Sequence, residues 1–392
     1  MIEKVLIFNY SGWNQIVSSL VEGLKLNKNL QLFSTTKSNY GSDIVIKSPH
    51  HYSVYPIGTN SMWIQSFVMG EEEYATECRQ LMDECDLIII FNHNDTESSA
   101  HFRVCDENIL SQELINYYTE QGYVLKHDGE ILTYLHLEAL QSLKNKVAMI
   151  NPGDFYSVRY GDYVGAHPTY SQVYFKREKS LDIDWPNNVH PMPFSAEERY
   201  FTVGKNFNEI WNNKKLNVSC LFRTDCHSDR PSIKEAVIKK YENDELCVVD
   251  GVFGRKIDDG LDEQLEGVDT GDCVRHHHFY FDILSDAKIN IEGPVGNTAF
   301  YTGRMMESLA NGCCYFYPTP NYNVDFPNGL VDGEDFVIYH NPDDLLDKIE
   351  YYLSHEEEMR TVAENGFNKL LKYHTSEVRA KEFIETCERY MG

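Results

Sequence analysis

Short apolar runs recur along the chain with amphipathic segments between them, a pattern that predicts a sheet whose strands are joined by helices. In the first half the apolar runs predict strands at Lys4–Phe8, Leu30–Ser34, Asp86–Asn92 and Lys146–Asn151. The helices expected around them are Asn14–Leu26, Glu71–Glu84, Leu110–Gln121 and Thr133–Leu143. Strands that alternate with helical crossovers pair in parallel, so this half predicts a Rossmann-like α/β domain.

The alternation fails between Leu181 and Asn213, where prolines and asparagines follow each other without a sustained period. It then restarts, with strands expected at Leu216–Phe222, Leu246–Asp250, Ala287–Glu292, Cys313–Tyr317 and Asp335–Tyr339. The pattern therefore predicts the α/β fold class, with two Rossmann-like domains that face a cleft. Their expected bounds are residues 1–190 and 214–392, joined by a linker at 191–213.

The helices of the second half have well-marked starts. A possible N-cap and a proline stand just ahead of Ser232–Tyr241, and Asn341-Pro342 opens a helix that runs to Tyr352. Two further helices, Glu356–Tyr373 and Ser376–Tyr390, end the sequence. A terminal helix of this kind can fold back across the first domain.

The length of the chain limits its number of domains, and its charge limits the kinds of partner it can bind. At 392 residues it exceeds the usual size of one core, which favours two domains. The formal net charge of −26 repels phosphate backbones and anionic membranes, so nucleic acid is an unfavoured partner. A protein this acidic must gather arginines locally to bind an anionic ligand, which makes arginines near strand ends informative.

The cysteines and the apolar segments indicate a cytoplasmic location. The ten cysteines form no Cys-x-x-Cys pair and no zinc-ligand spacing, which is typical of reduced thiols. The first residues carry an acid ahead of an apolar run that is too short for a signal sequence. Apolar stretches of about 18 residues do not occur, so the sequence predicts no transmembrane segment.

The segment from Tyr280 to Cys314 carries the most chemical information. It predicts a helix, a strand, a glycine-bearing loop, a second helix and a strand. The loop, Gly293–Gly303, follows a parallel strand and leads into a helix N-terminus, which is where open α/β sheets bind ligands and where backbone N–H groups favour phosphate. Candidate contacts of a phosphate-bearing ligand in this loop are Gly296, Asn297 and Thr302.

Arg304 and Glu307 are three residues apart at the start of the second helix and therefore share a face. The arginine can neutralise a diphosphate, while the glutamate can accept hydrogen bonds from ribose hydroxyls. The alternative is a surface ion pair, because Arg and Glu at this spacing are common on amphipathic helices. The spacing alone does not decide between the two.

The same segment resembles the donor domain of GT-B glycosyltransferases, especially the group-1-like transferases and the spore-maturation CgeB-type proteins. The resemblance continues through Gly329–Tyr339, Asn341–Leu353 and Glu364–Ala380, which look like the closing helices of those proteins in order. It covers about residues 275–385 as a run of ordered patterns. It implies a two-domain GT-B fold in which the second domain binds a nucleotide diphosphate-sugar.

The resemblance leaves the stereochemistry of transfer open. In the group-1-like enzymes this helix often carries two glutamates separated by seven residues, the second of which binds the nucleotide ribose. Glu307 matches the second, whereas Ala299 stands where the first would be. The remaining Arg-x-x-Glu pattern also resembles exostosin-like transferases and the phage DNA β-glucosyltransferase, which invert configuration.

The first turn of the second domain faces the donor pyrophosphate in GT-B enzymes, which implies further contacts. Arg223 is the stronger cationic candidate, while Arg230 can instead cap or pair within its own helix. Gly254, just after a strand, is a candidate for the base pocket or an ordinary turn residue. The consecutive histidines at 276–278 do not share a face, so they predict no metal site, and His278 is a candidate contact of the base or donor sugar.

A catalytic base is expected from the first domain, because the chemistry needs a carboxylate or imidazole near the acceptor hydroxyl. Asp154 follows the strand Lys146–Asn151 and resembles in its placement the acidic base of the phage glucosyltransferase, although loop aspartates are as often turn formers. Asp95, after another strand, is the second candidate. Gly12 and Trp13 are candidates for the acceptor wall, or else begin a helix that packs inward.

The sequence thus predicts a glycosyltransferase of glycan biosynthesis that moves a sugar from a nucleotide diphosphate-sugar to a hydroxyl of a glycan or small molecule. No cofactor is required, since arginines and helix termini can stabilise the leaving diphosphate, and a loosely bound magnesium ion is compatible with the site. Two alternatives stay open. One is a phage-type glucosyltransferase that acts on hydroxymethylated DNA, and the other is a non-catalytic two-lobed protein that binds sugars or nucleotides.

Overall fold

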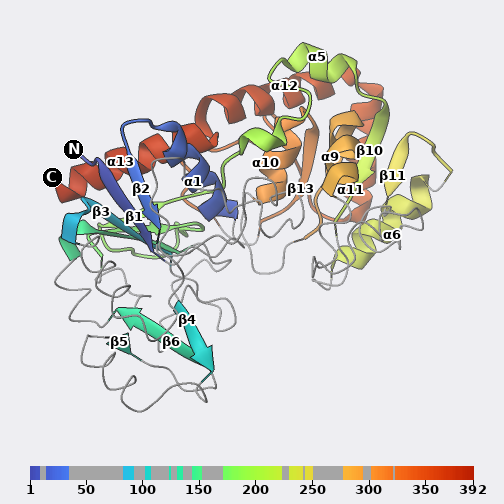
Figure 1. Cartoon of the computed structure of the whole chain (residues 1–392). Coiled ribbons are helices and arrows are strands. Elements are labelled where there is room, and N and C mark those ends of the chain that lie inside the picture. The colour runs from blue at the N-terminus through green and yellow to red at the C-terminus, as the bar shows by residue number, and fades with distance from the viewer. Residues whose placement is uncertain are drawn as a thin grey trace. The chain divides into compact units, whose positions relative to one another are not determined.

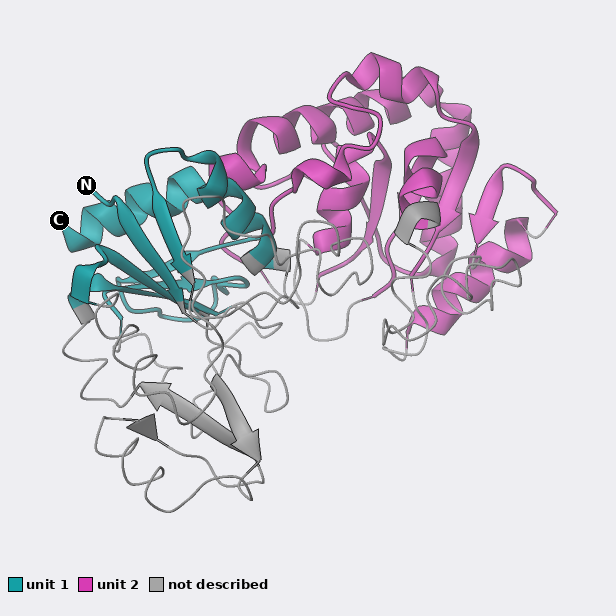
Figure 2. Ribbon diagram, in the orientation of Figure 1, with its two compact units in different colours: residues 1–45, 52–193, 379–392 teal, residues 46–51, 194–378 magenta. Residues whose placement is uncertain are grey.

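The chain forms two compact units, which Figure 2 colours separately. Unit 1 comprises residues 1–45, 52–193 and 379–392, and unit 2 comprises residues 46–51 and 194–378. The computed structural model describes residues 1–8, 15–34, 83–91, 102–106, 123–124, 130–135, 144–151, 171–222, 229–241, 243–249, 277–294, 302–320 and 323–392.

The main sheet of unit 1 has six strands in the order β2-β1-β3-β7-β8-β9, and every neighbouring pair is parallel. Its strands are β1 (Lys4–Phe8), β2 (Gln31–Ser34), β3 (Leu87–Phe91), β7 (Val147–Asn151), β8 (Val173–Lys176) and β9 (Val189–Pro191). Helix α1 (Gln15–Leu26) joins β1 to β2 (Figure 1). A short 3-10 helix, η4 (Lys144–Lys146), precedes β7. The predicted Rossmann-like pattern of the first half is confirmed by this sheet.

The core of unit 1 follows from its apolar runs. The strands β1, β3 and β7 are continuous apolar segments, as expected of parallel strands that are covered on both faces. Val5, Leu6 and Ile7 are all fully buried, as is Leu20 on the inner face of α1. Burial of such side chains stabilises the fold by about 1.5–3 kcal/mol each.

A second, antiparallel sheet in unit 1 was not expected. It has the order β4-β6-β5, formed by β4 (Phe102–Asp106), β5 (Tyr123–Val124) and β6 (Glu130–Leu135). The helix predicted at Thr133–Leu143 is therefore wrong at its start, because residues 133–135 belong to β6. The segment Glu-Ile-Leu-Thr-Tyr-Leu combines β-branched and aromatic residues that favour a strand. The helix predicted at Leu110–Gln121 and nearly all of Glu71–Glu84 lie outside the described residues.

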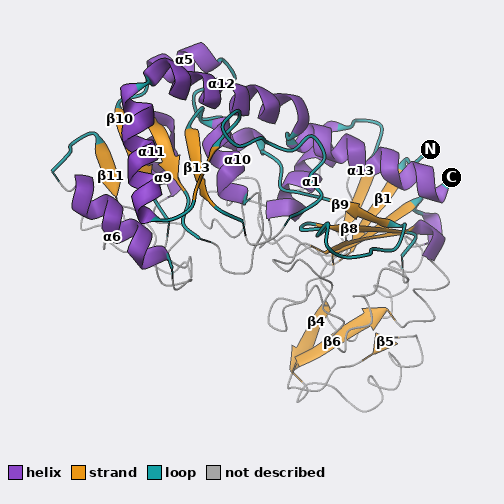
Figure 3. Ribbon diagram, turned by 180° about the vertical axis from the view of Figure 1, so that it is seen from behind, coloured by secondary structure: helices purple, strands orange, loops and turns teal. Residues whose placement is uncertain are grey.

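Unit 2 contains one five-stranded sheet in the order β11-β10-β12-β13-β14, again parallel throughout. Its strands are β10 (Leu216–Cys220), β11 (Cys247–Val249), β12 (Ala287–Ile291), β13 (Cys314–Pro318) and β14 (Val337–Tyr339). Figure 3 shows these strands with the helices packed around them. Each of the five lies within a residue or two of the apolar run that predicted it.

Unit 2 has helices between its strands and after the last strand. The described helices between strands are α6 (Arg230–Tyr241), α9 (His277–Asp286) and α10 (Gly303–Ala310), and β14 is followed by α11 (Pro342–Ser354) and α12 (Glu356–Tyr373). Asn341 caps α11, with its Oδ1 accepting a hydrogen bond from the N–H of Asp344 at 3.0 Å. In α12, Gly366 lets the helix pack closely, because a Cβ there would lie 2.3 Å from the carbonyl oxygen of Asp335.

Residues 194–213, most of the stretch expected as a linker, are packed within unit 2. They include a 3-10 helix, η6 (Glu198–Tyr200), and helix α5 (Phe207–Asn212). Phe207 packs against Phe367 of α12, with ring centroids 5.7 Å apart, and Ile210 and Trp211 are also buried. These contacts depend on side chains with no helical or strand period, which is why the sequence pattern did not reveal them.

Helix α13 (Ser376–Met391) contributes residues 379–391 to unit 1. There the carboxylate of Glu388 accepts a hydrogen bond from the N–H of Ile2 at 3.0 Å, and Phe383 packs against Phe175 of β8 with ring centroids 4.6 Å apart. Across the described residues, no helix is both long enough and apolar enough to cross a membrane.

Candidate functional site

A buried glutamate lies at the carboxyl end of β12 in unit 2. Glu292 directly follows the strand, and its side chain is 1% exposed. Its Oε2 accepts hydrogen bonds from Thr302 Oγ1 at 3.2 Å and from Tyr315 OH at 3.0 Å. Its Oε1 accepts one from the N–H of Gly293 at 3.1 Å. A carboxylate can be buried only with such a set of donors around it, so this position is built to hold one.

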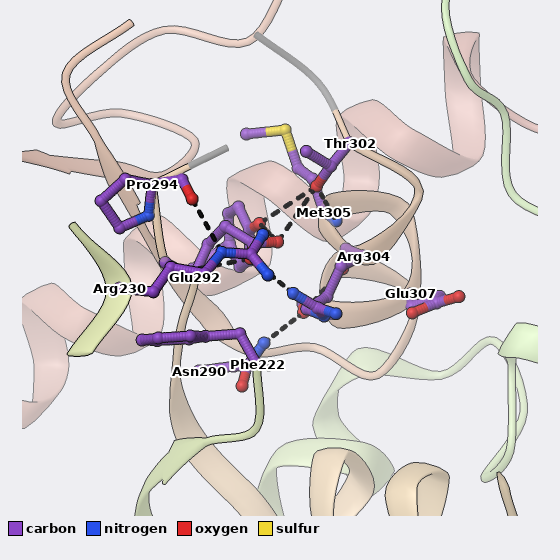
Figure 4. A network of polar contacts seen from close by, with 12 residues as sticks. Phe222, Arg230, Asn290, Glu292, Pro294, Thr302, Arg304, Met305 and Glu307 are labelled. Carbon is purple, nitrogen blue, oxygen red and sulfur yellow. Dashed lines mark hydrogen bonds and ion pairs between the residues drawn. The ribbon is translucent and has the colours of Figure 1, made fainter. Parts of the chain in front are cut away.

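Two arginines reach the same oxygen of Glu292 from different helices (Figure 4). Arg304 Nη1, from α10, lies 2.5 Å from Oε1, and Arg230 Nη2, from α6, lies 3.9 Å from it. Arg230 is 7% exposed and also donates from Nε to the carbonyl oxygen of Pro294 at 2.7 Å. The Arg304 side chain is 21% exposed, so part of this side chain remains accessible.

An aromatic ring packs beneath this cluster. Phe222, two residues after β10, lies under the Arg230 guanidinium, whose carbon is 5.7 Å from the ring centroid. Lys234 Nζ is also 5.7 Å from that centroid and donates to the carbonyl oxygen of Phe222 at 3.0 Å. Gly293 passes directly over the ring, where a Cβ would lie 2.6 Å from a ring carbon. The chain can leave β12 along this path only because residue 293 has no side chain.

Helix α10 begins at this cluster. Thr302 is its N-cap, with Oγ1 accepting a hydrogen bond from the N–H of Met305 at 3.2 Å. The same hydroxyl donates to Glu292, so the helix start and the strand end are joined by one side chain. The positive end of the helix dipole therefore lies beside Arg304, and both favour a negatively charged group.

A chain of buried polar side chains holds α10 against the sheet. Ser219 Oγ of β10 donates to Asn290 Oδ1 of β12 at 2.8 Å, and Asn290 Nδ2 donates to Ser308 Oγ of α10 at 2.6 Å. Close to the same end of the helix, Asn311 Nδ2 donates to the carbonyl oxygens of Glu307 and Tyr200, at 2.8 and 2.9 Å. These contacts hold the C-terminal half of α10, while Thr302 holds its start beside Arg304.

The charge of Arg304 is reinforced by its surroundings. Burial lowers the pKa of the guanidinium, but the carboxylate of Glu292 more than offsets this and leaves the pKa above its ordinary value. The pKa of Tyr315 is raised as well, but for a different reason. Burial, and then the charge of Glu292, raise the pKa of this phenol well above 10.0, so it stays a neutral donor.

Glu307 lies on the same helix but apart from the Glu292 cluster (Figure 4). Its Oε2 accepts a hydrogen bond from Tyr280 OH of α9 at 2.7 Å, and the residue is 8% exposed. Burial raises the pKa of the Glu307 carboxyl, while the hydrogen bond from Tyr280 and the positive charges of Arg304 and Arg199 partly counteract the rise. Arg199 belongs to the stretch expected as a linker, so that stretch contributes to the electrostatics of the site.

The structure brings together four of the predicted donor contacts. Arg230, Thr302 and Arg304 surround Glu292, and Glu307 lies one turn further along α10. His278 lies in α9, and its side chain is not described. The remaining predicted site residues lie outside the described residues: Gly12, Trp13, Asp95, Asp154, Arg223, Gly254, Gly296 and Asn297.

Sequence reasoning missed Glu292, the residue on which this cluster depends. The available signal was an acidic residue directly after an apolar strand and before Gly293-Pro294, at the edge of the sheet where ligands bind. Among the described residues, no group of three or more His, Cys, Asp or Glu side chains is arranged to hold a metal ion.

Residues 251–385 of the 392 match a family model described as glycosyl transferase-like. This match begins ahead of β12 and includes Glu292, Arg304 and Glu307. No curated protein matches the chain by sequence. The resemblance to glycosyltransferases inferred from the sequence is thus confirmed for this part of the chain.

Solved structures with the same fold extend over almost the whole chain. HepE of Anabaena in complex with UDP matches with a TM-score of 0.54 at 8% identity, over 99% of this chain and 100% of HepE. A glycosyltransferase from Rickettsia africae matches with a TM-score of 0.54 at 10% identity, over 100% of this chain and 99% of that one. An alpha-glucosyltransferase in complex with UDP and DNA matches with a TM-score of 0.53 at 11% identity, over 98% of both chains. The predicted α/β fold of two Rossmann-like domains, of the GT-B type, is confirmed.

Proposed function

We propose that the protein transfers a sugar from a nucleotide diphosphate-sugar to a hydroxyl of a glycan or small-molecule acceptor, with the donor bound at the carboxyl end of β12. The observation that carries this proposal is the accessible Arg304 at the start of α10, held in place by the buried Glu292. It lies in the region that matches the glycosyl transferase-like family model. Unit 2 would bind the donor, and unit 1 would bind the acceptor.

Arg304 and the helix start would stabilise the leaving group. During transfer the acceptor oxygen forms a bond to the anomeric carbon, and the bond from that carbon to the diphosphate oxygen breaks. The electron pair leaves with the nucleoside diphosphate, and the acceptor proton passes to a base. A guanidinium and helix N–H groups directed at the developing charge are the groups that lower this barrier without a metal ion, although magnesium remains compatible with the proposal.

Glu307 would bind the ribose of the donor. A carboxylate can accept hydrogen bonds from both ribose hydroxyls, and the hydrogen bond from Tyr280 OH holds its Oε2 in a defined position. Arg223, Gly254, His278, Gly296 and Asn297 stay proposed as further donor contacts, with Arg230 acting through Glu292 and Pro294.

The catalytic base and the acceptor site are proposed in the first domain. Asp154, three residues beyond the end of β7, is the proposed base, with Asp95 as the second candidate. Gly12 and Trp13 are proposed for the acceptor wall. The thiols of Cys85, Cys313 and Cys314 are buried and reduced, which suits a reducing compartment, and we infer a cytoplasmic location.

A second candidate function is glucosylation of DNA. It is favoured by the fold shared with an alpha-glucosyltransferase that was solved with UDP and DNA. The net charge of −26 opposes it, because binding to duplex DNA requires positive charge to offset the phosphates. Duplex affinity that falls steeply with salt would favour this function over a glycan or small-molecule acceptor.

The donor is tested by thermal unfolding with UDP-glucose, GDP-mannose and ADP-glucose. A donor present at a hundredfold its dissociation constant should raise the free energy of unfolding by about 2.7 kcal/mol. Slow hydrolysis of the same donor without an acceptor would distinguish an enzyme from a protein that only binds sugars or nucleotides. No stabilisation by any of the three would contradict the proposed function.

A further inference from the structure

We propose that Glu292 is a positioning residue that lowers the positive charge of the donor site, so that the nucleoside diphosphate product is released after transfer. This inference rests on the proposed function, since it concerns how the same site treats donor and product. It concerns the charge of the site as well as its shape.

The geometry of the cluster gives Glu292 two effects on Arg304. The short contact between Arg304 Nη1 and Glu292 Oε1, at 2.5 Å, fixes the guanidinium at the strand end, while the Arg304 side chain as a whole is 21% exposed. The carboxylate also cancels part of the positive field. Two guanidinium groups face one carboxylate here, so these three side chains together carry one positive charge rather than two.

The surroundings of Glu292 stabilise its carboxylate. Burial of a charge is costly, and a neutral residue would leave a more cationic pocket for a diphosphate. Instead Glu292 receives hydrogen bonds from Thr302, Tyr315 and the N–H of Gly293, in addition to its arginines. These neutral donors hold the carboxylate in addition to Arg304, so Glu292 stays in place when a phosphate contacts the same guanidinium.

The charge matters because donor and product differ in charge. Each phosphate of a nucleotide diphosphate-sugar is a diester-type group with one negative charge. Transfer leaves a terminal phosphate whose second ionisation has a pKa near 6, so the product carries roughly one further negative charge at neutral pH. A fixed carboxylate beside the phosphate site repels that additional charge and disfavours the product relative to the donor.

The test compares UDP with UDP-glucose by titration calorimetry in wild type and Glu292→Gln, or the GDP or ADP pair if one of these stabilises the protein instead. The glutamine keeps the size of the side chain and removes its charge. At pH 7.5 we expect the variant to raise the affinity for the diphosphate relative to the sugar nucleotide by about tenfold. At pH 5.5 this gain should largely disappear, since the terminal phosphate is then mostly protonated to its lower charge.

Glu292→Asp is the matched control, because it keeps the charge and shortens the reach to Arg304. It should weaken both ligands together and leave their affinity ratio at the wild-type value. A purely structural role would make Glu292→Gln weaken both ligands equally at both pH values, and that result would overturn the inference while leaving the proposed function intact. Failure of every nucleotide pair to bind wild type would overturn the proposed function itself.

A wild-type measurement covers the case in which the variants do not fold. With Glu292 present, the affinity for UDP relative to UDP-glucose should stay level or fall as the pH rises from 5.5 to 7.5. Among the described residues, the charged or titratable groups that act on Glu292 are Arg230, Arg304 and the phenols of Tyr280, Tyr315 and Tyr339, none of which titrates in this range. A relative affinity for UDP that rises about tenfold would overturn the inference.

Discussion

The carboxyl ends of the two parallel sheets differ in how they hold charge. In unit 2, β12 ends at a buried carboxylate that pairs with two arginines, and one of them, Arg304, is 21% exposed. In unit 1, β7 ends at Asn151, whose Nδ2 donates to Tyr174 OH at 3.0 Å, and β8 ends at Lys176. Lys176 Nζ lies 3.5 Å from Asn151 Oδ1, and this lysine is fully buried.

The difference teaches which strand end is suited to a diphosphate. A cation that is completely enclosed cannot contact a ligand unless the structure rearranges, whereas Arg304 has an accessible surface and a helix N-terminus beside it. Both strand ends belong to sheets of the same parallel type, so topology alone does not distinguish them. The four predictions that follow are ordered from the largest expected effect to the smallest.

Arg304→Ala should have the largest effect on donor binding. Loss of a charge-assisted contact with the diphosphate should raise the dissociation constant of the stabilising nucleotide sugar about 100-fold, or about 2.7 kcal/mol. Titration calorimetry measures this directly. The matched control in unit 1 is Lys176→Met, which should leave donor affinity within about twofold once its folding has been verified. Equal losses in the two variants would remove the distinction between the two strand ends.

Gly293→Ala should destabilise unit 2. The new Cβ would lie 2.6 Å from the ring of Phe222, and overpacking of this kind costs about 1–3 kcal/mol. The free energy of unfolding in urea measures the effect, and Phe222→Leu in the same chain should restore part of it. Gly204→Ala is the control for backbone strain alone, because that glycine has φ +106° with no atom within 4 Å of the added Cβ. A stable Gly293→Ala protein would show that the chain can leave β12 by another path.

Donor affinity should rise with pH through the titration of Glu307. Burial raises the pKa of this carboxyl above its ordinary value of 4.5, so the group is still partly protonated just above that pH, and only the carboxylate can accept both ribose hydrogen bonds. Affinity for UDP-glucose, which has no titrating phosphate between pH 5 and 8, should therefore increase up to about tenfold as the pH rises through the raised pKa. Because this pKa is raised in the folded state, ionisation of Glu307 lowers the free energy of unfolding of the ligand-free protein as the pH rises over that interval. Glu307→Gln should abolish both trends, and an unchanged pH profile in this variant would assign them to another group.

Thr302→Ala should have the smallest effect. Loss of the N-cap of α10 should lower the free energy of unfolding by about 1 kcal/mol, as should loss of the corresponding cap of α11 in Asn341→Ala. Only the Thr302 variant should also weaken donor binding, by a few fold, because Thr302, unlike Asn341, donates to Glu292. Equal loss of donor affinity in both variants would refute a role of the Thr302 side chain in the site.

The sequence was sufficient for most of the fold because its information is local. Continuous apolar runs located β1, β3 and β7, since a parallel strand covered on both faces needs no alternation, and largely apolar runs located the strands of unit 2. The N-caps and prolines located α11 in the same way. The three-stranded antiparallel sheet of unit 1 was missed because its strands are short and interrupt the expected alternation of strand and helix.

The position of the site was predictable from the sequence, but the contacts among its side chains were not. Arg304, Glu307 and Thr302 follow from the loop after a parallel strand and from the helix that this loop begins. Glu292 did not follow, because its role arises from donors spread over β13, α6 and α10 that only the fold brings together. For the same reason Arg199, far away in sequence, could not be connected with Glu307 before the structure placed them near one another.

The most direct test of the central claim is a crystal structure with the nucleotide diphosphate-sugar that most stabilises the protein. We expect the diphosphate to lie beside the start of α10, about 2.7–3.2 Å from the accessible nitrogens of Arg304, with Glu292 still holding the other side of that guanidinium. A diphosphate bound elsewhere, with Arg304 directed at solvent, would contradict it.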